Sequence, residues 1–411
     1  MIKRSFIALV ASALAVVASA QVKPGVEVLR DTDFSAIAGK KVGLITNPTG
    51  VDNKLKSTID ILHEAKNVEL VALFAPEHGV RGDVHAGDVV NDTIDAATGA
   101  RVFSIYGKNK KPSPEMLKGV EALVYDIQDI GCRSFTFVST LGLAVEAAAE
   151  NNIPLVVLDR PNPIGGNRVE GCLGEEGYFS FVSQFKIPYL YGLTPGEVAL
   201  FLNDQGMGAN GKKAEVIVVP MEGWTRDMTF DKTGMPWVLP SPHIPQPASA
   251  YYYPATGILG ELYYLSIGVG YTLPFQLMCA EWIDAEEFCN RMNKLDLPGV
   301  TCRPIHIKPF YSVGKGKNMQ GIQFYVKDIP EASLTLFQFY AMQELAEMYP
   351  DKKIFETTTD KSRFDMFDKV CGTVKIREMF SKNYKVADII DYWNKDAKAF
   401  KELSSKYYLY K

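Results

Sequence analysis

Residues 70–88 combine an apolar run with a dense group of side chains suited to acid–base, anion-binding or metal chemistry. Residues 70–74 are apolar enough to form a strand buried on both faces. Glycines interrupt the polar residues that follow, which are Glu77, His78, Arg81, Asp83, His85 and Asp88. Two of the five histidines of the chain lie in this stretch. The segment is either a solvated loop or one edge of an active site, and the elements around it decide between the two.

The elements that would position these side chains repeat from residue 40 to about residue 220. Each repeat has a short apolar run rich in β-branched residues, an abrupt polar or Gly/Pro end, and a segment with apolar residues at helical spacing. The apolar runs lie at 42–46, 70–74, 102–105, 122–126, 155–158 and 216–219. Because buried parallel strands read as continuous apolar runs, the pattern predicts an α/β fold. We expect a doubly wound, mostly parallel sheet with helices on both faces.

The sequence after about residue 250 is less regular and predicts a second, smaller α/β domain. It contains expected helices at 284–295 and 332–349, an expected strand at 321–328, and one or two amphipathic helices at 386–410. A Pro-rich segment at 237–257 separates the two parts. We therefore expect one domain over residues 21–250 and another over residues 251–411.

Polar or conformationally special residues follow the apolar runs. Ligands bind outside the carboxyl ends of strands in open parallel sheets, so these residues would share one rim. Each group also has a structural reading, as helix caps, turns or ion-pair partners. Several charged or amide-bearing ends on one rim nevertheless favour a ligand site. The rim comprises Asn47, Glu77, His78, Asp126, Gln128, Asp129, Arg133, Asp159, Arg160, Asn162, Arg168 and Glu170.

The residue types on this rim limit the chemistry. The sequence has no G-x-S-x-G nucleophile elbow and no glycine-rich phosphate-binding motif after its first strand. A metal cluster around His78 and His85 is a weaker alternative, because its spacing matches no H-E-x-x-H pattern. Carboxylates suit glycoside hydrolysis, in which one acid protonates the leaving oxygen and another group stabilises the anomeric centre or activates water. Arginines on the same rim would suit a substrate that carries a carboxylate.

Composition and the N-terminus restrict the setting in which the protein works. The 411 residues carry a formal net charge of −4, which gives no electrostatic basis for nucleic-acid binding. Residues 1–20 have Lys3 and Arg4, then an apolar run and an Ala-Ser-Ala end, the pattern of a cleaved secretory signal peptide. We therefore expect a periplasmic or secreted protein with no membrane insertion after cleavage. The six cysteines fit either disulfides or buried thiols, and the sequence leaves both open.

Six motifs lie in collinear order between residues 40 and 245. They are GLITNPTGVD, ALFAPEHGVRGD, VYDIQDIGCRSFTF, PLVVLDRPNPIGG with the following VEG, YGLTPGEVA and PSPHIP. Together they resemble the NamZ family of exo-β-N-acetylmuramidases. The resemblance implies a Rossmann-like N-terminal domain beside a smaller C-terminal domain, with the active site in the cleft between them. It also implies release of N-acetylmuramic acid from the non-reducing end of peptidoglycan glycan fragments, without a metal, nucleotide or other cofactor.

The same resemblance implies roles for individual residues. Glu77 is expected to be the catalytic acid/base, and His78 is expected to tune or orient it or to touch the sugar. Arg133 or Arg160 is expected to bind the lactyl carboxylate of muramic acid. The second group at the anomeric centre stays open among Asp126, Asp129, Glu170 and Glu261, and so does retention or inversion. The residues expected to line the pocket are Asn47, Asp126, Gln128, Asp129, Arg133, Asp159, Arg160, Asn162, Glu170 and Glu261.

One segment departs from the family pattern. Many relatives read roughly EGTNLSEGRGT where this chain has GELYYLSIGVGYT, residues 260–272. Glu261 is kept, but residues 262–264 become Leu-Tyr-Tyr and the arginine becomes Val269. If this loop touches substrate, we expect altered specificity toward another amino sugar, a peptide-bearing fragment or a longer glycan.

Two other classes of function compete with a glycosidase. A secreted protein that binds muropeptides or amino sugars without turnover would fit the altered loop, but the retained Glu77 and His78 argue against it. An esterase or amidase acting on wall material would need a nucleophilic serine, cysteine or zinc motif, which the sequence does not show.

Overall fold

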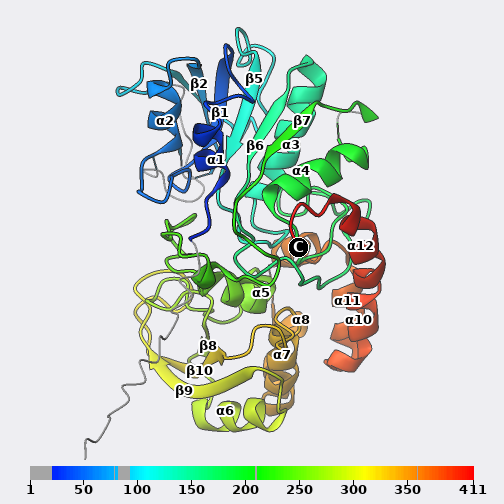
Figure 1. Ribbon diagram of the computed structural model, residues 1–411. Coiled ribbons are helices and arrows are strands. Elements are labelled where there is room, and N and C mark those ends of the chain that lie inside the picture. Colours follow the sequence, from blue (N-terminus) through cyan, green and yellow to red (C-terminus); the bar gives the residue numbers. More distant parts are fainter. Residues whose placement is uncertain (1–20, 78, 82–92, 209–210, 359) are drawn as a thin grey trace, which may run out of the picture.

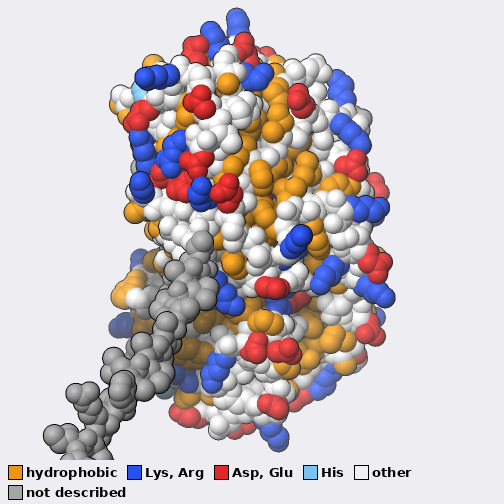
Figure 2. All heavy atoms as spheres, in the orientation of Figure 1, with side chains coloured by type: hydrophobic (Ala, Val, Ile, Leu, Met, Phe, Trp, Pro, Cys, Tyr) orange, Lys and Arg blue, Asp and Glu red, His pale blue; other side chains and the backbone are white. Residues whose placement is uncertain are grey.

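The computed structural model describes residues 21–77, 79–81, 93–208, 211–358 and 360–411 (Figure 1). The expected signal peptide at 1–20 lies outside these residues, as do His78, Asp83, His85 and Asp88. No helix within the described ranges is both long and apolar enough to cross a bilayer. Figure 2 shows acidic and basic side chains intermixed over the visible face of these residues.

A seven-stranded sheet forms the upper part of the molecule in Figure 1. Its strands are β1 (Lys41–Thr46), β2 (Glu69–Ala75), β3 (Thr93–Ile94), β4 (Arg101–Ser104), β5 (Ala122–Asp126), β6 (Leu155–Leu158) and β7 (Val216–Val219). The order is β3-β4-β2-β1-β5-β6-β7, and only the β3–β4 pair is antiparallel. β2, β4 and β3 lie on one side of β1, and β5, β6 and β7 lie on its other side. The prediction of a doubly wound, mostly parallel sheet is confirmed.

Helices cover both faces of this sheet. Since successive strand residues point to opposite faces, neighbouring residues of one strand pack against different helices. Leu44 of β1 packs in one core with α1 (Gly25–Asp31) and α2 (Thr58–Glu64). Its neighbour Ile45 packs in a second core with α3 (Phe137–Asn151) and α4 (Pro195–Asp204). The α4 helix begins with a capping box, in which Thr194 and Glu197 satisfy each other's backbone N–H groups. The YGLTPGEVA motif therefore encodes a helix start.

The second part of the chain lies below the large sheet in Figure 1 and is built on a small antiparallel sheet. Its strands, in the order β8-β10-β9, are β8 (Leu277–Ala280), β9 (Val300–Ile307) and β10 (Met319–Val326). Its helices are α5 (Ser249–Gly260), α6 (Ala285–Lys294), α7 (Phe337–Met348), α8 (Ile354–Thr357), α9 (Lys361–Cys371), α10 (Lys375–Asn383), α11 (Ile390–Asn394) and α12 (Ala397–Ser404). Short 3₁₀ turns add η2 (Phe230–Lys232), η3 (Pro350–Lys352), η4 (Val386–Asp388) and η5 (Ser405–Tyr407).

The predicted elements of this second part are confirmed with one correction. The helix at 284–295 is α6, and the strand at 321–328 is β10. The helix expected to begin at residue 332 begins instead at Phe337. Thr335, just before it, gives both its N–H and its hydroxyl to Glu170 of the first part, at 2.9 and 2.7 Å. A tertiary contact thus fixes the backbone of Thr335 outside the helix.

Each of the six cysteines lies in the described part of the chain and is a buried free thiol. Burial raises the pKa of the Cys132 and Cys172 thiols to about 11. Since the thiolate is the reactive form, these cysteines serve as apolar packing groups.

The last residues of the chain return to the large sheet. Phe400 of α12 enters the core that α3 and α4 form on that sheet, and Figure 1 shows α12 beside α4. The Tyr410 hydroxyl donates to Asp159 at 2.6 Å and accepts from the Met221 N–H at 3.0 Å. The Leu409 N–H donates to Glu197 at 2.9 Å. The C-terminus therefore ties the two parts of the chain together.

We expect Tyr410→Phe to lower the free energy of unfolding by about 1–3 kcal/mol, because it removes a donor from buried Asp159 and leaves the Met221 N–H unpaired. Urea unfolding followed by circular dichroism measures the loss. Tyr407→Phe is the matched control, because the Tyr407 hydroxyl donates to exposed Asp204, and such a change costs about 0.5 kcal/mol or less. Equal effects of the two variants would contradict the tie.

Candidate active site

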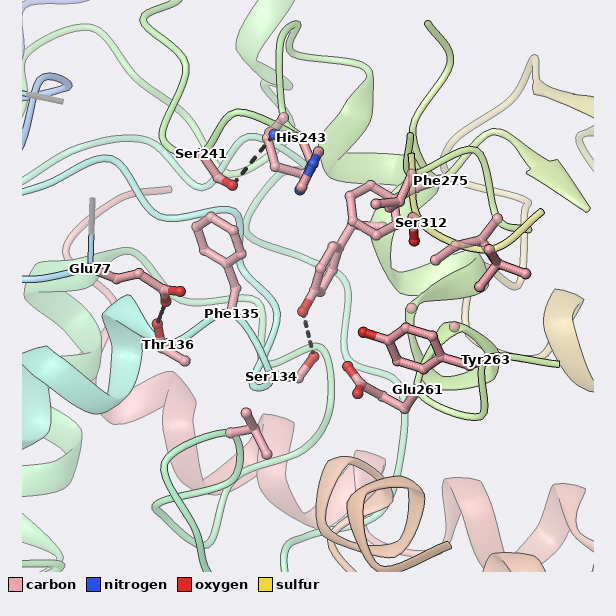
Figure 3. Close-up of a pocket in the computed structure, with 18 of the residues that line it drawn as sticks. Glu77, Ser134, Phe135, Thr136, Ser241, His243, Glu261, Tyr263, Phe275 and Ser312 are labelled. Atoms are coloured by element: carbon pink, nitrogen blue, oxygen red, sulfur yellow. Dashed lines mark hydrogen bonds between the residues drawn. The ribbon is translucent and has the colours of Figure 1, made fainter. Parts of the chain in front are cut away.

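A cavity of about 560 Å³ lies between the two parts of the chain. The large-sheet part contributes side chains that follow β2, β4 and β5, and the second part contributes α5, the loop after it and the loop between β9 and β10. Figure 3 shows that Glu77 and Glu261 enter the cavity from opposite sides. The other polar residues that line it are Tyr106, Ser134, Thr136, Ser241, His243, Tyr253, Tyr263, Ser266 and Ser312.

Glu77 follows the end of β2 by two residues and is held by two hydroxyls. Its Oε1 accepts from the Tyr106 hydroxyl at 2.9 Å, and its Oε2 accepts from the Thr136 hydroxyl at 2.9 Å. Tyr106 follows β4, and Thr136 precedes the first residue of α3. Burial, with the nearby charge of Glu77, raises the pKa of Tyr106, so the phenol remains a donor at neutral pH. The carboxyl group of Glu77 is therefore fixed in orientation at the cavity wall.

Glu261 is the C-cap residue of α5 and faces Glu77 from the second part. Burial raises the pKa of Glu261, and the positive charge of Arg363 partly offsets this rise. The Arg363 guanidinium lies 3.8 Å from the ring centre of Tyr263, which also lines the cavity. Arg363 therefore packs against Tyr263, and its positive charge lowers the pKa of Glu261.

Tyr253 lines the same cavity, close enough to both carboxyl groups for their charges to act on it. Burial raises the pKa of Tyr253 well above its ordinary value, and the charges of Glu261 and Glu77 both add to the rise. Its hydroxyl lies 3.2 Å from the Ser134 hydroxyl, which donates to Tyr189 at 2.9 Å. The hydroxyl groups of Tyr253 and Ser134 thus give the cavity wall a neutral, hydrogen-bonded polar surface.

The loop that departs from the family pattern lines this cavity. Gly260, Glu261, Tyr263, Leu265, Ser266, Ile267 and Val269 all contribute to the wall. Phe135, Phe181 and Phe275 add aromatic surface, and His243 of the PSPHIP motif lies 2.6 Å from the Tyr311 hydroxyl through its Nε2. None of the described lining residues is a lysine or an arginine. The cavity therefore combines two carboxyl groups with hydroxyls, one imidazole and apolar walls.

Arg133 lies outside this cavity, contrary to the expectation that it binds the lactyl carboxylate. It is fully buried, and burial lowers its pKa. Its guanidinium donates to the carbonyls of Cys172 and Ile187 at 2.8 and 2.6 Å, and to those of Val370 and Cys371 at 3.2 and 2.7 Å. The last two are the final carbonyls of α9, where a cation is favourable. Arg133 therefore joins the two parts of the chain.

Arg160 and Asp126 form a buried ion pair behind the strand ends. Arg160 Nη2 donates to Asp126 Oδ2 at 3.0 Å and to the Val51 carbonyl at 2.8 Å. Asp126 also accepts from the Thr58 hydroxyl, at 2.5 Å. Both ionic side chains are at most 3% exposed, so neither is placed to contact a ligand. The expected lactyl contact of Arg160 and the candidacy of Asp126 at the anomeric centre are thereby corrected.

Three further rim residues hold loops and helix ends. Asp159 accepts the Gly196 N–H and the Thr194 hydroxyl at the start of α4, both at 2.7 Å, and burial raises its pKa to about 7. Asn162 donates to the Leu193 carbonyl at 3.1 Å. Glu170 pairs with Arg168 and accepts from Thr335. The side chains of Asp159, Asn162 and Glu170 therefore stabilise the fold, and they do not belong to the cavity lining.

The remaining rim residues shape the turns after β1 and β5. Asn47 accepts from the Thr49 hydroxyl at 2.5 Å, and the side chain of Gln128 donates to the carbonyls of Asp129 and Pro161 at 2.8 Å. Asp129 accepts from the N–H groups of Ile130 and Gly131 and from Tyr191, while burial raises its pKa to about 6. The three side chains are 2–6% exposed and lie outside the cavity lining. Of the expected catalytic and pocket residues that the structure describes, Glu77 and Glu261 line the cavity.

Sequence reasoning missed several side chains that the fold brings to Glu77. Thr136 and Tyr253 carry no local pattern that marks them as functional. Tyr106 follows the third apolar run as Glu77 follows the second, but the sequence alone gave it no role. His243 lies in a motif of the family resemblance but was not assigned a role. Among the described residues, no group of three or more His, Cys, Asp or Glu side chains is arranged to hold a metal ion.

The fold and the cavity together define a class of protein. The cavity lies at the carboxyl ends of strands, where ligands bind in open parallel sheets, and its two facing carboxyl groups fit glycoside hydrolysis. Residues 42–248 match the family described as exo-β-N-acetylmuramidase NamZ, N-terminal, and residues 251–410 match its C-terminal counterpart. The chain belongs to the NamZ exo-β-N-acetylmuramidase family.

Relatives of known sequence or structure agree with this assignment. The chain is 42% identical over 390 residues to the peptidoglycan β-N-acetylmuramidase NamZ of Bacillus subtilis strain 168, covering 95% of this chain and 92% of that protein. Two DUF1343 family proteins of Bacteroides fragilis NCTC 9343 have similar crystal structures. One is 58% identical with a TM-score of 0.92, and the other is 26% identical with a TM-score of 0.74. Each similarity covers 95% of this chain and 99% of the other.

We expect Arg160→Gln to lower the free energy of unfolding by about 3–5 kcal/mol, because it leaves the Asp126 carboxylate buried without its counter-charge. Urea unfolding measures the loss. Glu77→Gln is the control, since it changes a side chain at the cavity wall, and we expect a loss of about 1 kcal/mol or less. An Arg160→Gln variant that is stable but inactive would contradict this structural role and would indicate that Arg160 binds the ligand.

Proposed function

We propose that this protein is an exo-acting glycoside hydrolase that releases N-acetylmuramic acid from the non-reducing end of peptidoglycan glycan fragments. Glu77 is its acid/base group, and Glu261 is the second carboxyl group at the anomeric centre. The observation that carries this proposal is that, of the expected carboxylates, these two share one cavity, in a chain that belongs to the NamZ family. The other three candidates for the second group are each engaged in buried structural contacts.

The hydroxyl groups around Glu77 suit an acid/base role. Tyr106 and Thr136 fix both carboxyl oxygens, so the group is oriented before substrate binds. A proton on Glu77 can pass to the leaving glycosidic oxygen as the glycosidic bond breaks. Glu261 then either bonds to the anomeric carbon until water displaces it, with Glu77 taking the proton of that water, or itself takes a proton from the attacking water. Glu261 faces Glu77 across the cavity (Figure 3), which is the arrangement that a mechanism with two carboxyl groups uses.

The cavity also indicates how an acidic sugar is held. We propose that the hydroxyl groups and the His243 imidazole that line the cavity bind the lactyl carboxylate of muramic acid, since both can donate hydrogen bonds to it. Ser241 and Ser312 lie on the same side of the cavity as His243. This replaces the expectation that Arg133 or Arg160 makes the contact.

We further propose that the enzyme works in the periplasm or outside the cell. The charged start, apolar run and Ala-Ser-Ala end of residues 1–20 support export. Wall fragments are the substrate that an exported member of this family would meet.

Glu77→Gln is expected to lower kcat/KM on a chromogenic β-N-acetylmuraminide by about 10²–10⁴-fold, because the amide cannot transfer the proton. Release of the chromophore measures the rate, and circular dichroism checks that the fold is intact. Full activity of Glu77→Gln would remove the acid/base assignment. Binding of muropeptides by a wild-type protein that releases no product would favour the alternative of a binding protein.

Arg363→Gln is expected to raise the pKa of Glu261, because it removes the positive charge that lowers it. The limb of the pH profile of kcat/KM that reports Glu261 then moves to higher pH. Arg363→Lys keeps the charge and should keep the wild-type profile. An identical profile in Arg363→Gln would contradict a role for Glu261 in the reaction.

A further inference from the structure

Exposed aromatic side chains gather beside the cavity. Phe310 is 67% exposed and Tyr311 is 48% exposed, and exposed apolar side chains that gather in one place mark interaction sites. Both lie in the loop between β9 and β10, directly before Ser312 and Val313 of the cavity wall. Tyr263, at 52%, is exposed at the cavity itself. These three exposed aromatic side chains therefore indicate a binding surface beside the cavity.

The loop is built rigidly against its neighbour. The Phe310 N–H donates to the Gly270 carbonyl at 2.7 Å, and the rings of Phe310 and Tyr271 stack at 5.9 Å with planes 19° apart. Gly270 has a φ of +92°, and a Cβ there would lie 2.0 Å from the Tyr311 carbonyl oxygen. The Tyr311 hydroxyl meets His243 at 2.6 Å. The aromatic rings are therefore ordered before any ligand binds, which reduces the entropic cost of binding.

The rings of Tyr271 and Phe310 also form part of a second groove, of about 660 Å³. It is lined by Tyr271, His306, Lys308, Phe310, Asn318 and Gln320, among others. The two adjacent loops connect it to the active-site cavity, because Val269 and Ser312 line the cavity while Tyr271 and Phe310 line the groove. On each loop, the residue that lines the groove is therefore two positions from one that lines the cavity.

From this adjacency we propose that a glycan longer than the cavity extends into the groove, and that Phe310, Tyr311 and Tyr271 form a stacking platform for the sugar residues that follow the terminal muramic acid. The inference rests on the proposed function and defines its substrate class as glycans longer than a disaccharide. Amino sugars present an apolar C–H face that packs on an aromatic ring, and their amide and hydroxyl groups can pair with Asn318 and Gln320. Lys308 supplies a positive charge for an acidic substituent on a later residue of the glycan.

The test compares kcat/KM on a peptide-free glycan tetrasaccharide that ends in muramic acid with kcat/KM on an aryl β-N-acetylmuraminide. Phe310→Ala is expected to lower the ratio of tetrasaccharide to aryl glycoside about tenfold, since it removes the outer face of the platform. Phe310→Trp keeps an aromatic face and should keep the ratio near wild type. Phe179→Ala is the matched control, because Phe179 is an exposed phenylalanine outside both linings, and it should leave the ratio unchanged.

A binding measurement separates failure of this inference from failure of the proposed function. Calorimetry in the Glu77→Gln background, with and without Phe310→Ala, gives the affinity for the tetrasaccharide and for N-acetylmuramic acid. We expect Phe310→Ala to weaken tetrasaccharide binding about tenfold more than it weakens monosaccharide binding. Equal effects on both ligands would overturn the platform. A wild type that hydrolysed neither substrate would overturn the proposed function, and the calorimetry would still decide the platform.

Discussion

The buried guanidinium of Arg133 is the contact on which the active-site geometry depends. It bonds two carbonyls of the large-sheet part and two at the end of α9, and so joins walls that come from distant parts of the sequence. The next residues along the chain, Ser134 to Phe137, line the cavity. A cation in this position gives up hydration and is stabilised by four carbonyl dipoles. The hydrogen bonds of Arg133 thus hold in place the two parts of the chain that carry Glu77 and Glu261.

Burial separates two kinds of carboxyl group in this protein. Asp126, Asp159 and Glu170 lie within the protein, where they satisfy arginines, helix ends and hydroxyls. Glu77 and Glu261 lie at a cavity, where their oxygens can reach a substrate. A perturbed pKa alone does not distinguish the two kinds, since Asp129 and Asp159 are also shifted. Access to the cavity distinguishes them.

The loop at 260–272 and the loop before β10 act as one unit. Gly270 allows the backbone of the second loop to approach closely, and Tyr271 supports the Phe310 ring. The apolar wall at Ile267 and Val269 continues into this aromatic surface. Polar or charged residues at these positions would change both the cavity and the proposed path of the glycan. The departure from the family motif is thus coupled to the shape of the binding region.

The sequence alone determined the alternation of strands and helices, the position of Glu77 after β2, and the family to which the chain belongs. These follow from local periodicity and short motifs. It did not determine which rim residues face the cavity, because Arg133, Asp126 and Glu77 look equivalent as polar residues after strands. Only the tertiary structure decided this, since α5, α9 and the C-terminal residues bury some of those side chains and leave others accessible. Solvent access and the contact across the two parts arise from long-range packing, which local sequence patterns do not encode.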